Sequence, residues 1–431
     1  MELGLVRIRA LLQRLGDPAG TFPSVVVAGT DGKGSTSAML ARMLGSAGLR
    51  VGHYTSPHLV ETRERVAIGG ELATADALDA ALASVQAATA IAPELDPTPF
   101  EALTAAALLL FRDASIDVAV LEVGLGGRLD ATNATEPVVS VITNLSYDHT
   151  AILGDTLSKI AYEKAGVARE GRALVSGQPG LVKAALRKYG IAPRLLTLGV
   201  DLSVAHYSSV GSQLRATGAL RGPALADDLV VELAMPGRHQ FDNAGLAVLA
   251  YLALAEWWAA MRDKPLPPVD EVVPDLAEID WPLRAEVLQT DPLLLADAAH
   301  NPAGMQALAA LMAERGKLWQ VVLAVRSDRD AAELLRPLAP VTQAFFLPRC
   351  SNPTLMPAEQ LAAVIDQVAP GAAVGVSGPH RCVVQALREA NKGCGVVVTG
   401  SQHALGEWLQ LGVIHSPRLE KRLGRVLVGP A

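Results

Sequence analysis

The sequence predicts an α/β protein with two domains, each built on a mostly parallel sheet. Short runs of β-branched residues alternate with longer helical patterns along the chain, as in repeated βαβ units. The length of 431 residues suits two or three domains at roughly 150 residues each. A Pro-rich, acidic stretch from Lys264 to Pro282 breaks the alternation and indicates a linker. We therefore expect a larger N-terminal domain over residues 1–281 and a smaller, Rossmann-like C-terminal α/β domain over residues 282–431.

The expected strands of the first domain lead into polar or glycine-containing segments. Val25–Ala28 predicts a strand, followed by a glycine-rich turn and a helix from about Ser35 to Ala47. Two more apolar strands are expected at Asp117–Val123 and Val138–Thr143. Open α/β sheets bind ligands at the carboxyl ends of their strands, so these segments are candidates for a site. Beyond the linker the alternation restarts, with strands expected at Leu293–Ala296, Val321–Val325 and Gly395–Thr399.

The composition excludes several classes of protein. The net charge is −7 and no basic run could follow a phosphate backbone, so we expect no nucleic-acid partner. The three cysteines are odd in number and lack Cys-x-x-Cys spacing, which argues against a disulfide framework or a zinc site and fits a reducing cytosol. The most apolar stretch, Gly245 to Ala255, ends at Glu256, well short of the ~20 residues that a membrane span needs. We expect it to be a buried helix of a soluble, cytoplasmic protein.

The strongest motif lies at residues 25–36, where a strand, a glycine turn and a helix start follow one another. Glycines let the backbone turn its N–H groups toward an anion, and the helix N-terminus adds positive potential. Lys33 can reach the β- and γ-phosphates and the Ser35 hydroxyl can bind Mg²⁺, although Gly34 between them departs from the strict Walker A pattern. The alternative is a glycine-rich turn without a ligand. A P-loop ATPase domain is therefore expected, with candidate nucleotide-binding residues Gly29, Thr30, Gly32, Lys33, Gly34 and Ser35.

The same loop opens a series of segments that resembles a known family. The loop is similar to that of the Mur ligase superfamily, in which Asn usually stands where this chain has Asp31. The resemblance covers essentially the whole chain and is nearest to the dihydrofolate synthase/folylpolyglutamate synthase family. The most specific part is the Glu-Val-Gly-Leu-Gly-Gly-Arg-Leu-Asp-Ala-Thr-Asn run, residues 122–133. The other matching segments are Thr55–Leu59, Asp148–Thr150, Glu163–Gly166, Gly237–Gln240 with Asn243, and Asp297–Pro302.

The resemblance implies a metal site and a modified lysine. By resemblance, Ser56, Glu122 and His149 are the protein ligands of two Mg²⁺ ions, a cation that needs few protein oxygens beside phosphate and water. Taken alone, Asp-His would more simply be a hydrogen-bonded loop segment. The lysine of Glu-Lys-Ala-Gly is carbamylated in the family, which here is Lys164. Its alternative is an ordinary helix lysine with its ammonium in water. A monovalent cation is a further implied cofactor.

By resemblance, ATP is also contacted by Asn243 and, from the second domain, by Arg284 and Asp297, with His300 near the phosphates. Arg284 follows Leu283, where the family commonly has glycine. Asp297 follows an apolar strand and could accept ribose hydroxyls. The alternative for Asp297 is the N-cap of a helix. Lys33, Lys164 and His300 are the expected catalytic residues.

The acceptor substrate is implied in the same way. By resemblance, Leu129, Asp130 and Ala131 contact dihydropteroate, and Phe100 packs on the pterin or is a core aromatic. Only 28 residues precede Gly29, so we expect no separate nucleotide-sugar domain of the peptidoglycan ligases. The segment from Glu2 to Ile8 resembles the family's pterin loop, without the helix that usually precedes it.

The function implied by the resemblance is ATP-dependent amide-bond formation through an acyl phosphate. L-glutamate would be joined to dihydropteroate and then to reduced folates, in a protein expected to act as a monomer on small molecules. Two alternatives remain open at this point. One is a folylpolyglutamate synthase that does not use dihydropteroate, and the other is a P-loop nucleotide-binding protein or kinase of another pathway.

Overall fold

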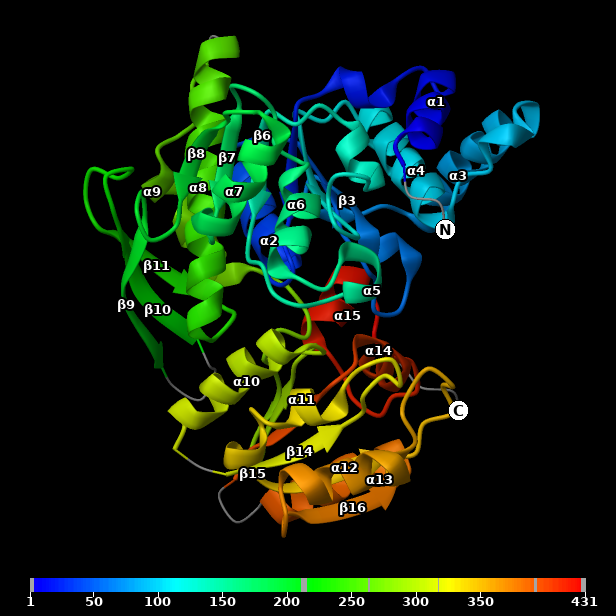
Figure 1. Cartoon of the computed structure of the whole chain (residues 1–431), viewed down its shortest axis with the longest axis vertical. Helices are drawn as coiled ribbons and strands as arrows, with labels where there is room; N and C mark the ends of the chain where they lie inside the picture. Colours follow the sequence, from blue (N-terminus) through cyan, green and yellow to red (C-terminus); the bar gives the residue numbers. More distant parts are fainter. Residues whose placement is uncertain (1–3, 211–214, 263, 317, 391–393, 428–431) are drawn as a thin grey trace. The chain divides into compact units, whose positions relative to one another are not determined.

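The structure is a computed structural model that describes residues 4–210, 215–262, 264–316, 318–390 and 394–427 (Figure 1). It divides into two compact units. The first contains Met1–Tyr207, Gly218–Glu232 and Gln240–Ile279, and the second contains Ser208–Thr217, Leu233–His239 and Asp280–Ala431. Two short segments before residue 240 therefore group with the second unit, so one boundary in the sequence does not separate the two units. The division at 281/282 stays a prediction.

The first unit is built on an eight-stranded sheet with the order β4-β3-β2-β5-β1-β6-β7-β8. From β2 across to β8 every neighbouring pair runs parallel, while β3 and β4 extend one edge in antiparallel fashion. This confirms the expected mostly parallel sheet. The strands are β1 (Ser24–Ala28), β2 (Val51–Tyr54), β3 (Val66–Ile68), β4 (Glu71–Leu72), β5 (Val118–Glu122), β6 (Val139–Ile142), β7 (Ala173–Ser176) and β8 (Arg194–Thr197).

The helix Pro99–Asp113 begins at a clear sequence signal. The Thr98 hydroxyl accepts a hydrogen bond from the Glu101 amide, and the Glu101 carboxylate accepts one from the Thr98 amide. Pro99 takes the first helical position. The α-helices are α1 (Val6–Arg14), α2 (Lys33–Ser46), α3 (Ala75–Ile91), α4 (Pro99–Asp113), α5 (Thr150–Leu153), α6 (Leu157–Ala165), α7 (Pro179–Tyr189), α8 (Arg238–Met261) and α9 (Val269–Val272). Short 3₁₀ turns are η1 (Pro18–Thr21), η2 (Thr62–Arg65), η3 (Pro93–Leu95), η4 (Ala131–Ala134) and η5 (Val273–Glu278). A three-stranded sheet joins β9 (Ser203–Val210), β10 (Arg215–Arg221) and β11 (Leu229–Leu233).

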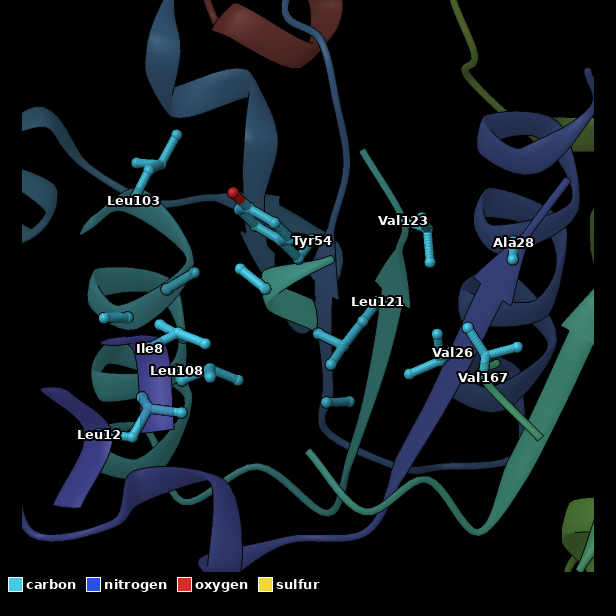
Figure 2. Close-up of a cluster of buried hydrophobic side chains, with 14 of the residues drawn as sticks. Ile8, Leu12, Val26, Ala28, Tyr54, Leu103, Leu108, Leu121, Val123 and Val167 are labelled. Atoms are coloured by element: carbon cyan, nitrogen blue, oxygen red, sulfur yellow. The ribbon is translucent and has the colours of Figure 1, made fainter. Parts of the chain in front are cut away.

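The core of the first unit includes side chains of the parallel sheet and of helices α1 and α4. Figure 2 shows Ile8 of α1 beside Leu108 of α4, with Leu121 of β5 and Val26 of β1 on the sheet. All four side chains are fully buried. Burial of such aliphatic side chains contributes roughly 1.5–3 kcal/mol each. This packing fixes the strands whose carboxyl ends carry the candidate site.

The structure tests two expectations, a buried helix around Gly245–Ala255 and a linker from Lys264 to Pro282. Helix α8 is long and apolar enough to cross a membrane by length and composition, but most of its side chains are buried in the fold, as in the core helix of a soluble protein. That confirms the expected buried helix. The expected linker from Lys264 to Pro282 is wrong in part, because it contains α9 and η5. Val272, Val273 and Leu276 are buried there, and the segment packs against α2. Its prolines obscure an apolar spacing that is helical.

The second unit holds a six-stranded sheet with the order β12-β13-β17-β14-β15-β16, in which only the β12–β13 pair is antiparallel. Helices on a parallel sheet confirm the Rossmann-like expectation. Its strands are β12 (Glu286–Thr290), β13 (Leu293–Ala296), β14 (Trp319–Leu323), β15 (Thr342–Pro348), β16 (Ala373–Ser377) and β17 (Val396–Thr399). Its helices are α10 (Pro302–Glu314), α11 (Ala331–Leu335), η6 (Ala339–Val341), α12 (Ala358–Val368), α13 (Pro379–Ala390), α14 (Gln402–Gln410) and α15 (Pro417–Leu423).

Candidate active site

The phosphate loop begins where β1 ends, and two of its glycines occupy positions that no other residue could take without strain. Gly29 has a φ of 146° and Gly32 a φ of 78°. A Cβ on Gly29 would lie 1.8 Å from Thr143 Oγ1, and one on Gly32 would lie 2.2 Å from Asn243 Oδ1. Helix α2 starts at Lys33 and no side chain caps its N-terminus. Its first N–H groups are thus available to an anion.

Three consecutive carbonyl oxygens of the loop are occupied by donors from the protein. Lys164 Nζ donates to the Gly29 carbonyl at 2.7 Å, and Lys33 Nζ donates to the Thr30 carbonyl at 2.8 Å. Thr143 Oγ1 donates to the Asp31 carbonyl at 2.5 Å. The loop is therefore held from its carbonyl side.

The segment after β6 braces the same loop and was missed by sequence reasoning. Asn144 accepts from the Asp31 amide at 2.7 Å through its Oδ1 and donates to the Asp31 carboxylate at 3.4 Å. Ser146 Oγ donates to that carboxylate at 3.2 Å, and Thr30 and Ser146 exchange two further hydrogen bonds. The polar Thr-Asn-Leu-Ser run directly after an apolar strand was the available signal.

Lys164 is buried, with a relative exposure of 4%. Burial, and then the positive charge of Lys33, lowers the pKa of the Lys164 ammonium to about 7, although Asp148, Asp31 and Asp130 act in the opposite direction. The alternative of a helix lysine with its head in water is therefore wrong. A neutral amine near pH 7 is the form that can react with carbon dioxide.

The expected metal ligands come partly together. Tyr54 of β2 pairs with Leu121 of β5, so Ser56 and Glu122 follow neighbouring strand ends. The Ser56 amide donates to Glu122 Oε2 at 3.0 Å, and the Glu122 side chain is buried.

His149 lies on the loop after β6 in a left-handed conformation with a φ of 50°. Its side chain is half exposed, and its Nε2 lies 3.8 Å from Asp148 Oδ1. Across the described ranges no three His, Cys, Asp or Glu side chains form a metal-binding group. One carboxylate and one hydroxyl still suit Mg²⁺, which takes its other ligands from phosphate and water.

The register of the strands places the phosphate loop and the expected metal ligands at the carboxyl ends of adjacent strands. Val27 of β1 pairs with Glu122 of β5, and Ala28 pairs with Ile142 of β6. The carboxyl ends of the adjacent strands β2, β5, β1 and β6 therefore carry Ser56, Glu122, the phosphate loop and the Asn144–His149 segment in that order. This agrees with the position that ligands take in open α/β sheets.

The glycine-rich run after β5 is organised by Asp130, whose side chain is buried. Its carboxylate accepts from the Leu125 amide at 2.9 Å and from the Thr132 amide and hydroxyl at 3.0 and 2.6 Å. Burial raises the pKa of the Asp130 carboxyl, against these hydrogen bonds. The structure thus gives Asp130 a local role that the sequence did not reveal, beside the expected substrate contact.

The neighbours of Asp130 differ in exposure. Leu129 is half buried, whereas Ala131 is buried. Phe100 is half buried against Tyr54, with ring centroids 6.0 Å apart, and a Cβ on Gly124 would lie 2.7 Å from its ring. Phe100 is therefore at least in part a packing residue.

The run is tied to the helix of Lys164 by an ion pair that sequence reasoning missed. Arg128 binds the Glu163 carboxylate through both Nε and Nη2, at distances down to 2.8 Å. The Arg128 guanidinium also lies over the Tyr162 ring, 5.7 Å from its centroid. Such bidentate pairs fix orientation as well as adding energy. The last turn of the helix that carries Lys164 is therefore tied to the glycine-rich run.

On α8, Asn243 and Gln240 share one face, as expected from their spacing. Asn243 Nδ2 donates to Gln240 Oε1 at 3.0 Å, and Thr36 Oγ1 donates to Asn243 Oδ1 at 3.4 Å. Asn243 is thereby placed beside the start of α2. Its contact with ATP stays a prediction.

The second unit carries the other expected nucleotide residues at the start of β12 and the end of β13. Arg284 is half buried, and its Nη1 donates to the Leu283 carbonyl at 3.1 Å. Asp297 is buried and accepts from the Ala285 and Ala299 amides, both at 2.8 Å. Asp297 is not a helix N-cap, because Asn301 takes that position for α10 by accepting from the Gly304 amide. His300 Nδ1 lies 2.9 Å from the Ala298 carbonyl oxygen.

Two family models match the chain. The Mur ligase middle domain matches residues 27–251, and the Mur ligase glutamate ligase domain matches residues 283–402. The chain belongs to the Mur ligase family.

Curated relatives place this Mur ligase among the dihydrofolate synthase/folylpolyglutamate synthases. The Mycobacterium tuberculosis dihydrofolate synthase/folylpolyglutamate synthase is 35% identical over 383 residues, which is 84% of this chain and 77% of that protein. A probable bifunctional folylpolyglutamate synthase/dihydropteroate synthase of Haloferax volcanii is 37% identical over 348 residues, which is 78% of this chain. This Mur ligase spans only 40% of that relative and 48% of a second such protein from Halobacterium salinarum.

Solved structures of Mur ligases have the same fold. Mycobacterium tuberculosis folylpolyglutamate synthase complexed with ADP and AMPPCP gives a TM-score of 0.85 at 29% identity, covering 99% of this chain and 96% of that one. Escherichia coli FolC in complex with DHPP and ADP gives 0.80 at 29% identity, covering 95% and 93%. The Yersinia pestis bifunctional enzyme complexed with AMPPNP and Mn ion gives 0.79 at 30% identity, covering 95% and 93%.

Proposed function

We propose that this Mur ligase joins L-glutamate to 7,8-dihydropteroate and to reduced folates, with ATP as the energy source. The observation that carries the proposal is the pair of lysines that donate to one phosphate loop, Lys33 and the buried Lys164 of α6. A simple kinase or nucleotide switch needs the loop and a metal ligand, but it has no use for a second, buried lysine of lowered pKa. The relatives named dihydrofolate synthase/folylpolyglutamate synthase support the choice of substrates.

The first step is phosphoryl transfer to the acceptor. An oxygen of the acceptor carboxylate attacks the γ-phosphorus of ATP, the bond from that phosphorus to the β-γ bridging oxygen breaks, and ADP leaves. Lys33 and the N–H groups at the start of α2 stabilise the charge that develops on the transferring group. The product is an acyl phosphate.

The second step forms the amide. The neutral amine of L-glutamate attacks the acyl carbon, the bond to the phosphate oxygen breaks, and inorganic phosphate leaves while the nitrogen loses a proton. On a folate that already carries glutamate, the acceptor is the γ-carboxylate. Acyl phosphates hydrolyse readily, so a site that excludes water protects the intermediate.

Two Mg²⁺ ions are proposed to supply charge neutralisation at the phosphates. Ser56, Glu122 and His149 are the residues that would hold them, and the hydrogen-bonded pair of Ser56 and Glu122 supports this set. The Mn ion with AMPPNP in the Yersinia pestis enzyme is consistent with a divalent metal beside the nucleotide. Arg284, Asp297, His300 and Asn243 keep their proposed roles toward ATP, and a monovalent cation is a further proposed cofactor.

A carbamate on Lys164 is proposed from its burial and the lowered pKa of its amine. Native mass spectrometry should find the wild-type chain 44 Da heavier, the mass of one carbon dioxide, and acid treatment should remove that mass. Lys164→Ala should lose ligase turnover and regain part of it with short carboxylic acids. A Lys164→Ala variant that is fully active without added acid would contradict the carbamate.

The proposed acceptor contacts are Leu129, Asp130, Ala131 and Phe100. The narrower alternative, a folylpolyglutamate synthase that ignores dihydropteroate, differs only at this subsite. The chain is further proposed to act in the cytoplasm as a monomer.

The deciding experiment measures ADP release from purified protein with ATP and Mg²⁺. Dihydropteroate, a reduced folate monoglutamate and a peptidoglycan precursor are compared as acceptors, each with and without L-glutamate. We expect release that requires both glutamate and a pterin acceptor, and none with the peptidoglycan precursor. ADP release that is independent of glutamate, with a phosphorylated acceptor as product, would indicate a kinase and contradict the proposed ligase function.

A further inference from the structure

The turn that carries Arg284 has an unusual backbone. Leu283 has a φ of 53° and Ala285 a φ of 45°, so residues with a Cβ occupy the left-handed region on both sides of the arginine. Such conformations are costly for residues other than glycine and persist only when the surroundings hold them. The Leu283 side chain is fully buried. The turn is therefore fixed from inside the second unit.

Two buried carboxylates grip the turn, one at each end. Glu286 Oε2 accepts from the Leu283 amide at 3.0 Å, and Asp297 Oδ2 accepts from the Ala285 amide at 2.8 Å. The Ala298 amide closes the frame by donating to the Leu283 carbonyl at 2.9 Å.

The C-terminal part of the chain completes the grip on Glu286. Ser416 Oγ lies 2.9 and 2.7 Å from the two Glu286 oxygens, and the Arg418 amide donates to Oε1 at 3.0 Å. Arg418 is half buried, and its guanidinium donates to the carbonyls of Trp281 and Ala234. The start of α15 is thus bonded to the residue that shapes the arginine turn.

Arg284 itself uses little of its hydrogen-bonding capacity. Within the described part of the chain, its guanidinium has the Leu283 carbonyl as its one acceptor and no carboxylate partner. An arginine has five N–H donors, and a half-buried one without an acid is suited to an anion from outside the protein.

We propose that Glu286, held by Ser416 and Arg418, is a positioning residue that fixes Arg284 in the orientation required to bind the phosphates of the nucleotide. This inference rests on the proposed function, because it takes the ligand of Arg284 to be ATP. Through these hydrogen bonds to Glu286, the start of α15 also contributes to the position of Arg284, although it lies far along the chain. A purely structural Glu286 would stabilise the second unit without changing what Arg284 binds.

Substitution of Glu286 by glutamine separates these roles. The amide keeps the volume but replaces one acceptor oxygen by an NH₂ group, which faces the donors of Leu283, Ser416 or Arg418. The turn then loses one of its holds while the core stays filled. Glu286→Gln should therefore misplace Arg284 more than it unfolds the chain.

The test is a double-mutant cycle on the full chain, with AMPPNP and Mg²⁺ as the probe in titration calorimetry. Arg284→Ala should weaken AMPPNP binding by roughly tenfold or more, as loss of a charged hydrogen bond does. Glu286→Gln should weaken it comparably, and the double variant should bind no worse than Arg284→Ala alone. Additive losses would overturn the inference, because positions that act through one another are not additive. An unchanged affinity of Arg284→Ala would overturn it as well.

Leu361→Ala is the matched control, since Leu361 is buried in the core of the same unit and belongs to α12 rather than to the turn. It should lower the midpoint of urea unfolding yet leave AMPPNP affinity unchanged. If Glu286→Gln does not fold, Ser416→Ala replaces it in the cycle with the same expected outcome. Glutamate-dependent ADP release by the wild type is measured in parallel. If the wild type lacks that activity, the proposed ligase function is wrong. Additive losses in the cycle contradict only the positioning role of Glu286.

Discussion

At the residue scale, Lys33 and Lys164 donate to adjacent carbonyls of one loop but differ in their surroundings. Lys33 begins a helix on a glycine turn, whereas Lys164 is buried and the pKa of its ammonium falls to about 7. The first is suited to following a phosphate that moves during the reaction. The second is suited to existing as a neutral amine.

Lys33→Ala should leave stability nearly unchanged and lower kcat by on the order of a hundredfold or more, because it removes electrostatic stabilisation of the transferring phosphoryl group. Glutamate-dependent ADP release and thermal unfolding measure the two effects. The matched control is Lys159→Ala, which removes an exposed lysine paired with Asp155. Wild-type turnover in Lys33→Ala would remove this lysine from the mechanism.

Lys164→Met should stabilise the chain, and the gain should depend on pH. The folded-state pKa of Lys164 lies near 7, below that of an unfolded lysine, so the unfolded chain binds more protons between about pH 7 and 10.5. The cost of burying the amine is therefore complete below about pH 7 and is relieved as pH rises through this window. Urea unfolding in carbon dioxide-free buffer should show a larger gain at about pH 6 than at about pH 9. Equal gains would mean that Lys164 does not titrate there.

At the element scale, the glycine-rich run between β5 and η4 has a structural role beside the substrate contact expected from its sequence. The run was expected to hold the acceptor, but its Asp130 also accepts three hydrogen bonds from within the run. A substrate contact and a structural one can use different lone pairs of the same carboxylate.

Asp130→Ala should therefore lower the free energy of unfolding, by about 1–3 kcal/mol, as well as dihydropteroate-dependent ADP release. The control is Thr132→Val, which removes one of the same hydrogen bonds and leaves the carboxylate in place. Thr132→Val should lose part of the stability and keep the acceptor preference of the wild type. If both variants keep that preference, Asp130 is a structural residue only.

Sequence reasoning located elements well where the apolar run was sharply bounded. The strand Leu293–Ala296 was predicted with its observed bounds, because Pro292 precedes it and Asp297 follows it. The strand expected at Val321–Val325 instead spans Trp319–Leu323. The expected end was too late because the apolar run continues past the carboxyl end of the strand. The segment from Lys264 to Pro282 was misread because its prolines outweighed a helical spacing.

Site residues were predictable where neighbours in sequence make the chemistry. The phosphate loop falls in one twelve-residue stretch, so its glycines and Lys33 could be identified directly. The hold of Ser416 on Glu286 spans 130 residues and could not be identified, because nothing local in either segment indicates the other. Burial of Lys164 likewise depends on packing around α6.

At the scale of the whole molecule, the N-terminal segment bears on the choice of acceptor. The segment expected as a pterin loop is only partly a loop, since Val6, Arg7 and Ile8 belong to the first turn of α1. Ile8 is fully buried and Arg7 pairs with Glu101 of α4. Glu2 and Leu3 lie outside the described residues.

The wild-type protein should use both dihydropteroate and a reduced folate monoglutamate as acceptors. Deleting residues 1–4 should lower ADP release with dihydropteroate more than with reduced folate, without a change in unfolding temperature. Deletion through Ile8 is the comparison that should also destabilise the chain, because it takes a core side chain from α1. Turnover of reduced folate but never of dihydropteroate by the wild type would leave a folylpolyglutamate synthase alone.

The occupied carbonyls of the phosphate loop have one more consequence. A peptide plane that rotates by half a turn exchanges its oxygen for its hydrogen, and glycine-rich loops are prone to such flips because no Cβ opposes them. Here the oxygens of Gly29, Thr30 and Asp31 are each bonded to a donor, so a flip would break a hydrogen bond every time. The amide hydrogens of Thr30 and Asp31 are held in the same way, because both donate to Asn144. Little reorientation of the loop remains for the binding step, and its cost is met during folding.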